Sequence, residues 1–325
     1  MPADLFATRK KEEKKMAANV ETMFSTRTKP WHGLGTIVAE APDSKAALGY
    51  AGLDWNVIRR EVFTEEGLRI PGYYANVRDS DFTTLGIVSE RYHVVQNQEA
   101  FAFTDQLLGE GVTYETAGVL QGGKIVWMLA KMPEKYIIAG DEITPYFVIM
   151  NSHNGSTGLH AALTPIRVVC QNTLNLALST AKRSWTTRHT ENIRGRINEA
   201  EKTLFMANQY MTELGKEIGH LSQIKLTDSK VIRMMEDFYP VSAEMSDGQK
   251  KNNQKLLEDM KQRYFDAPDL SSVGRNGYRF INAVSDFATH AEPVRKTKNY
   301  KENLFLRTAD GNAMIDKAYK MVLAA

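Results

Sequence analysis

Cysteine is almost absent from this chain of 325 residues, which contains only Cys170. A single thiol excludes an intramolecular disulfide framework and any multi-cysteine metal cluster, and it is typical of a reducing compartment. The sequence also lacks a run of eighteen apolar residues, so it predicts no transmembrane helix. These absences favour a cytoplasmic protein that does not partner with a membrane.

The chain also lacks an excess of positive or negative charge, because its formal net charge at pH 7 is only +2. Attraction to nucleic acid would therefore have to come from local patches and not from the overall field. Residues 1–19 carry charges on both sides of Phe6 and lack the apolar core of a signal peptide. We expect this segment to be a flexible leader.

The chain is longer than the usual size of one compact core. Segments rich in β-branched and aromatic residues at 54–63, 73–80 and 83–96 predict three antiparallel strands. The turns QGG at 121–123 and NGSTG at 154–158 each predict a hairpin. The pattern predicts an α+β fold, with antiparallel sheets and packed helices in a core domain over 20–190 and a mostly helical region over 191–325.

Helical periodicity and capping residues predict the helices. One begins at Asp43 or Ser44, one at Asn97, and a Leu-rich one covers 170–182 with Asn172 as its cap. After residue 191 the pattern predicts further helices at 191–221, 227–239, 274–291 and 312–325. The polar stretch 242–272 is expected to be partly mobile.

Two glycine-rich stretches resemble phosphate-binding loops only superficially. In GVLQGGKI, Lys124 is followed by Ile125, so the hydroxyl that would hold magnesium is missing, and a strand follows where a helix is required. HGLGT at 32–36 lacks the preceding strand that dinucleotide binding needs. Both stretches indicate ordinary turns.

Four residues could supply metal ligands: His153, His160, Cys170 and His189. Their spacing matches no short-range ligand pair, and few carboxylates lie near them in the sequence. His153 and His160 flank the NGSTG turn and could approach each other, but a polar hairpin end is the simpler interpretation. We therefore predict no metal and no other cofactor.

The segment that follows the predicted Leu-rich helix combines basic and aromatic residues at close spacing. It contains Lys182, Arg183, Trp185, Arg188, His189, Arg194 and Arg196. The arginines could bind phosphates while Trp185 stacks on an unpaired base. Arg59 and Arg60, in an early strand, could extend the same groove. The alternative is a solvated face with Trp185 packed inward on the core.

Several stretches together resemble a known family: KPWHGLGTIV (29–38), TPIRVVCQNTLNLAL (164–178), RHTENI (188–193), NAVSDFATHAEP (282–293) and GNAMIDKAYKMVLA (311–324). They are similar to the phage- and plasmid-borne family called domain of unknown function 932, over residues 20–325. The resemblance implies a bacterial host cell and a mobile-element context of single-stranded DNA handling and anti-restriction, but no reaction. Family members usually have an acidic residue before the late histidine, whereas Thr289 precedes His290 here, so we expect an Asp–His pairing there to be weakened.

The strand–helix pattern is also similar, at the level of fold, to single-strand annealing recombination proteins. Our leading hypothesis is a non-enzymatic single-stranded DNA-binding protein, able to form rings or filaments of identical subunits, with Asn172 and Asn175 as further polar contacts. The alternative is a modulator that binds and blocks a host defence protein, through residues 242–270. A third hypothesis, a metal-dependent enzyme using His153, His160 and His189, lacks the paired carboxylates of a nuclease.

Overall fold

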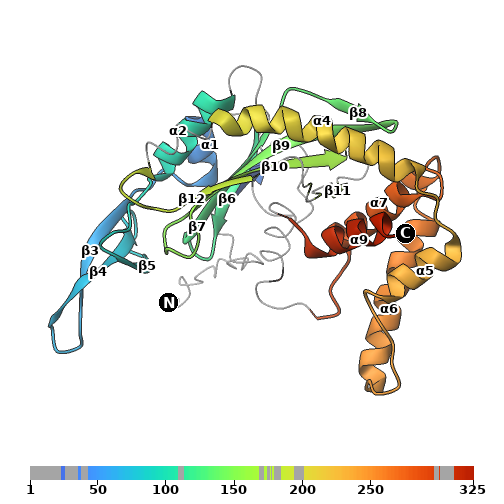
Figure 1. Cartoon of the computed structure of the whole chain (residues 1–325). Helices are drawn as coiled ribbons and strands as arrows, with labels where there is room; N and C mark the ends of the chain where they lie inside the picture. The colour runs from blue at the N-terminus through green and yellow to red at the C-terminus, as the bar shows by residue number, and fades with distance from the viewer. Residues whose placement is uncertain are drawn as a thin grey trace, which may run out of the picture.

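The computed structural model describes residues 23–25, 36–37, 43–108, 113–167, 172–173, 176, 178, 184–193, 201–295, 300 and 311–325. Over these residues the fold is α+β, as the sequence predicts (Figure 1). Strands fill the first part of the chain, and helices dominate after residue 200. The predicted leader, residues 1–19, lies outside the described residues. No described helix is long and apolar enough to cross a membrane.

A large sheet forms the centre of the fold, with the strand order β11-β10-β9-β7-β6-β1-β2. Two more strands join it, since β12 pairs with β10 and β8 pairs with β9. Every described pairing is antiparallel except that of β1 with β2. The strands are β1 (Met23–Ser25), β2 (Thr36–Ile37), β6 (Thr113–Leu120), β7 (Ile125–Lys131), β8 (Tyr136–Ile138), β9 (Asp141–Ser152), β10 (Leu159–Arg167), β11 (Asn172–Thr173) and β12 (Ser184–Thr187).

The central strands β7 and β9 are buried on both faces, which explains their nearly continuous apolar sequences. Both predicted hairpins are confirmed. The turn 121–124 joins β6 to β7, and the turn 153–158 joins β9 to β10. In the first turn Gly122 and Gly123 have φ values of 69° and 89°, a left-handed conformation that glycine adopts without steric cost.

A separate three-stranded sheet, in the order β3-β4-β5, projects from one end of the molecule (Figure 1). It contains β3 (Val57–Phe63), β4 (Arg69–Arg78) and β5 (Thr84–Ser89), so the three predicted antiparallel strands are confirmed. Asn76 of β4 donates from Nδ2 to the carbonyl of His153 across 2.7 Å. This buried bond joins the small sheet to the turn that follows β9.

The helices pack around the large sheet and at its two ends (Figure 1). Helix α4 runs along the large sheet, α1 and α2 lie at the end near the small sheet, and α5, α6, α7 and α9 gather at the other end. Their bounds are α1 (Ser44–Ala51), α2 (Asn97–Leu108), α4 (Glu201–Gln223), α5 (Asp228–Glu236), α6 (Asp247–Phe265), α7 (Gly277–His290) and α9 (Ala313–Leu323). One apolar cluster runs through both regions, from Ala47 to Val322. The boundary at residue 190 stays a prediction.

Two local predictions need correction. The predicted helix over 170–182 is wrong where the structure describes it, because Asn172 and Thr173 form strand β11 and neither Leu176 nor Leu178 is helical. The buried Leu176 carbonyl accepts instead from the Tyr210 hydroxyl of α4 across 2.8 Å. This tertiary bond replaces the intrahelical one.

The polar stretch 242–272 contains the regular helix α6, and its partial mobility stays a prediction. A capping box between Ser246 and Gln249 begins this helix. Leu257, Met260 and Tyr264 form its buried stripe against the core. Asn97 is not the cap of α2, because it is the first residue of that helix and its side chain bonds to other segments.

Candidate functional site

A pocket of about 310 Å³ lies where three segments that are distant in the sequence meet. They are the end of β5 with the residues after it, the turn between β9 and β10, and the residues after β12. The described lining consists of Ser89, Arg91, Tyr92, Gly155, Ser156, Thr157, Gly158, Arg188, His189 and Thr190. We call this site the basic pocket.

Two glycines let the β9–β10 turn fit between its neighbours. A Cβ on Gly86 of β5 would lie 2.6 Å from Asn154 Cα, and a Cβ on Gly158 would collide with the Thr187 carbonyl. The turn therefore packs against β5 on one side and against β12 on the other. This close packing brings Arg91 and Arg188 to the same pocket.

The charge of the basic pocket has one sign. Arg91 and Arg188 are exposed, and none of the ten described lining residues is acidic. Arg59 lies beside the pocket, because its Nη2 donates to the carbonyls of Ser89 and Glu90 across 3.3 and 3.4 Å. Its guanidinium also lies 4.1 Å from the centre of the Tyr74 ring. Three arginines thus lie at or beside one concave surface, and Arg59 is held there by hydrogen bonds.

Two stacked rings form the inner wall of the pocket. The rings of Tyr92 and His189 lie 4.6 Å apart at an angle of 15°. His189 donates from Nδ1 to the His93 carbonyl across 2.9 Å, and the Tyr92 hydroxyl donates to the Ser152 carbonyl. Burial lowers the pKa of His189 and outweighs the opposing effect of the His93 carbonyl. His189 is therefore neutral at pH 7, and the arginines carry the charge of the site.

His153 is fully buried behind this wall. It donates from Nε2 to Asn97 Oδ1 across 2.8 Å, and Asn97 in turn donates to the Leu53 carbonyl across 3.0 Å. Burial, with smaller effects from His189 and Arg78, lowers the pKa of His153 to about 3. His160 has a separate partner, since its Nδ1 lies 2.7 Å from Thr186 Oγ1.

The three histidines considered as metal ligands therefore have three different hydrogen-bond partners. Among the described residues, no three His, Cys, Asp or Glu side chains gather as a metal site would require. Cys170 lies outside the described residues. The predicted absence of a metal remains a prediction.

The structure brings part of the predicted interface together. Arg188 and His189 line the basic pocket and Arg59 adjoins it, whereas Arg60 lies on the opposite face of β3. Trp185 of β12 is half-buried and packs on the apolar core. Four predicted residues and one proposed polar contact lie outside the described residues: Lys182, Arg183, Arg194, Arg196 and Asn175. Asn172 pairs with Arg167 in the large sheet.

The sequence did not predict Arg91 and Tyr92 as site residues, although both line the pocket. The signal was present as the stretch SERYH at 89–93, a basic–aromatic pair directly after a strand. It repeats on a smaller scale the composition of the segment after β12. Its proximity to that segment depends on long-range pairing and cannot be read from local spacing.

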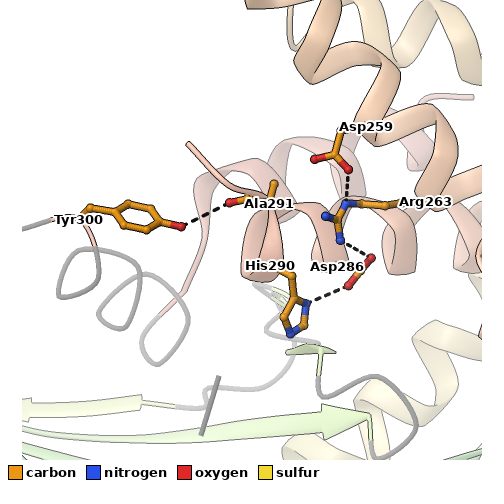
Figure 2. Close-up of polar contacts among 6 residues, drawn as sticks. All are labelled: Asp259, Arg263, Asp286, His290, Ala291 and Tyr300. Carbon is orange, nitrogen blue, oxygen red and sulfur yellow. Dashed lines mark hydrogen bonds and ion pairs between the residues drawn. The ribbon is translucent and has the colours of Figure 1, made fainter. Parts of the chain in front are cut away.

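A second polar site connects α6 and α7 (Figure 2). His290 donates from Nδ1 to Asp286 Oδ1 across 2.8 Å, and Arg263 Nη1 donates to Asp286 Oδ2 across 2.5 Å. Arg263 Nε donates to Asp259 Oδ1 across 2.8 Å. The expected weakening of an Asp–His pairing is therefore wrong, because Asp286, one helical turn before His290, supplies the carboxylate that Thr289 cannot.

Asp286 is ionised in this α6–α7 cluster. Burial alone would raise the pKa of Asp286, but the hydrogen bond from His290 and the charge of Arg263 outweigh it, and the pKa falls below its ordinary value. Arg263 and His290 also line a pocket of about 470 Å³ with Lys255, Glu258, Asp259 and Glu292 among its other residues. Charges of both signs surround this second pocket.

The fold and these two sites define an α+β protein with a basic pocket between its two sheets. Residues 84–309, more than half of the chain, match the family model described as Domain of unknown function (DUF932). The chain therefore belongs to this family, as its sequence motifs predict. No curated protein and no solved structure matches the chain.

Proposed function

We propose that the chain is a single-stranded DNA-binding protein that binds phosphates at the basic pocket without regard to sequence. The observation that carries this proposal is the convergence of Arg91 and Arg188 on one concave surface whose described lining contains no acidic residue. The planar guanidinium group matches phosphate geometry through paired hydrogen bonds. Arg59, fixed at the pocket edge by Ser89 and Glu90, adds a third cation.

The other lining residues suit a phosphate backbone. Ser156, Thr157 and Thr190 carry hydroxyl groups that can donate hydrogen bonds to phosphate oxygens. In the sequence, Lys182 and Arg183 directly precede β12, and Arg194 and Arg196 follow shortly after the pocket residues. A chain with a net charge of only +2 can attract DNA at such a concentrated patch.

The test is binding of fluorescent oligo-dT over a series of salt concentrations. The unmodified protein is compared with Arg91→Ala/Arg188→Ala, and with Arg233→Ala as the control. Arg233 is exposed on α5, at the opposite end of the molecule (Figure 1). The slope of log K against log salt should fall by about 0.7 for each phosphate contact removed. Arg233→Ala should keep the original slope.

Two results would overturn this proposal. One is the absence of binding at low salt in the unmodified protein. The other is a double variant that stays folded and binds with an unchanged slope. Strand annealing and assembly into homo-oligomers are a further part of the proposal, and light scattering together with a two-oligonucleotide annealing assay tests them.

A modulator that binds a host defence protein remains the alternative proposal. The pocket at the α6–α7 cluster favours it, because Lys255 and Glu258 place exposed charges of both signs on one concave surface. Mixed, polar rims are typical of protein interfaces. If oligo-dT does not bind, charge reversals at Lys255 and Glu258 become the first variants to test against candidate defence enzymes.

A further inference from the structure

Exposed apolar side chains gather on the small sheet. Ten large hydrophobic residues are exposed among the described residues, and five of them lie in the segment 57–89: Phe63, Leu68, Tyr73, Phe82 and Ile87. This segment is only a tenth of the chain. Leu68 and Phe82 lie in the turns between the strands, whereas Tyr73 and Ile87 lie on β4 and β5, where neighbouring exposed apolar side chains indicate a surface that contacts a partner.

The register of the small sheet separates its two faces, because directly paired residues share a face. Asn76, Gly86 and Val88 lie on the inner face, where Gly86 and Val88 approach the β9–β10 turn. The outer face carries the paired sets Arg60–Ala75–Ile87 and Tyr73–Ser89. Tyr73 and Ile87 are each 52% exposed, and Arg60 is exposed beside them.

The paired sets of the outer face carry one positive charge and no negative charge. Arg60 is the one charged residue in these paired sets, and none of their members is acidic. Glu61 pairs with Tyr74 and lies on the inner face. An aromatic ring, an aliphatic side chain and a cation therefore lie together on the outer face.

The outer face and the basic pocket lie on opposite sides of the small sheet and meet at the end of β5. Ser89 lines the pocket and is also the direct cross-strand partner of Tyr73. A strand bound at Arg91 that passes around the end of β5 at Ser89 would reach the ring of Tyr73.

We propose that unpaired bases of the bound strand stack on the outer face of the small sheet, with the ring of Tyr73 as the main contact and Arg60 beside it. This inference rests on the proposed function and names where the bases of the strand bind. Base–aromatic stacking is tolerant of sequence because every base has a π-face. Trp185 is half-buried against the core, so Tyr73 offers the larger open ring.

The experiment compares oligo-dT binding to the unmodified protein, Tyr73→Ala, Tyr73→Phe and Tyr50→Ala. Tyr50 on α1 is also 52% exposed and serves as the matched control. Tyr73→Ala should weaken binding by roughly 5- to 100-fold, the range expected for one lost stacking contact. Tyr73→Phe should retain affinity, because it keeps the ring, and Tyr50→Ala should change little.

A strand of abasic deoxyribose phosphate separates bases from phosphates. It should bind the unmodified protein and Tyr73→Ala equally, and it should still lose affinity in Arg91→Ala/Arg188→Ala. If Tyr73→Ala binds oligo-dT normally while the double arginine variant does not, the stacking inference is wrong and the proposed function stands. If the unmodified protein binds no oligo-dT, the proposed function itself fails.

Self-association is the competing use of the outer face. Light scattering on Tyr73→Ala distinguishes it, because a self-contact surface predicts a change in assembly size without DNA. Suppose that Tyr73→Ala dissociates into smaller assemblies, and that cross-linking it into the original assembly restores normal affinity for oligo-dT. The loss of affinity would then come from the loss of assembly, and the stacking inference would be wrong. A variant of unchanged size with weaker binding supports it.

Discussion

His290 donates from Nδ1 to Oδ1 of Asp286 across 2.8 Å, one turn apart on α7, while Arg263 of α6 holds the other carboxylate oxygen (Figure 2). The ionised carboxylate therefore joins two helices. Its pKa lies below the ordinary value of 3.8 in the folded protein, because the hydrogen bond from His290 and the charge of Arg263 outweigh the effect of burial.

This pairing predicts a dependence of stability on pH. Because the folded pKa of Asp286 is lowered, its contribution is fully present above the unfolded value and is lost as the pH falls through the folded value. Asp286→Asn should lower the free energy of unfolding by about 1–3 kcal/mol at pH 7. The difference should shrink below pH 3.8. Urea unfolding at both pH values measures it, and equal losses would contradict the prediction. Glu258→Gln, exposed on α6, is the control.

Arg279 is predicted to be a major stabilising residue of the helical region. Its buried side chain donates to the carbonyls of Tyr264, Leu270 and Val273 across 2.8, 2.6 and 2.7 Å. Arg279→Met keeps the length but removes these donors, although the Leu270 carbonyl still accepts from the Val273 N–H, and should cost about 3 kcal/mol or more. Arg233→Met, on an exposed surface, should cost less than about 0.5 kcal/mol. Similar losses in urea unfolding for the two variants would contradict this role.

Alanine substitutions at two glycines, Gly158 in the β9–β10 turn and Gly219 on α4, are predicted to have opposite effects on stability. A Cβ at position 158 collides with the Thr187 carbonyl, whereas a Cβ at Gly219 of α4 has open space around it. Gly158→Ala should lower stability and, by displacing Arg188, weaken oligo-dT binding. Gly219→Ala should raise stability by up to about 1 kcal/mol, the difference in helix propensity. Thermal unfolding and DNA titration of both variants check this, and unchanged DNA binding in Gly158→Ala would argue against the proposed position of Arg188.

Asn97 is predicted to hold the buried histidine in place. It donates to the Leu53 carbonyl and accepts from His153 Nε2, both in the interior. Asn97→Ala should cost about 2–4 kcal/mol, since it leaves buried groups unpaired and removes packed atoms. The ring signals of His153 in a proton–nitrogen NMR spectrum should shift in this variant. Asn252→Ala, exposed on α6, should leave both stability and these signals unchanged.

Local sequence signals were sufficient for much of the fold. The turn signals at 121–123 and 154–158 predict hairpins correctly, because a short turn with glycines determines the pairing of the strands beside it. Asp43 and Thr227 cap α1 and α5 as their positions predict. These features depend on residues within one or two turns of chain.

Features that depend on distant partners were missed or wrong. The Leu-rich segment after residue 170 has helical spacing. However, the Leu176 carbonyl accepts a hydrogen bond from the hydroxyl of Tyr210, 34 residues further along the chain. The pocket partners Arg91 and Arg188 follow different strands, β5 and β12, so neither is informative about the other in the sequence. The carboxylate beside His290 was sought at the preceding position, whereas neighbours on a helix surface are three or four residues apart.

The apolar cluster that runs from Ala47 to Val322 has a consequence for how the protein loses its structure. Buried residues of α9, such as Val322, share that cluster with residues of α1 and of the large sheet. Heating should therefore melt sheets and helices together as one cooperative unit. A calorimetric scan is expected to give a single endotherm, with a van't Hoff enthalpy equal to the calorimetric one.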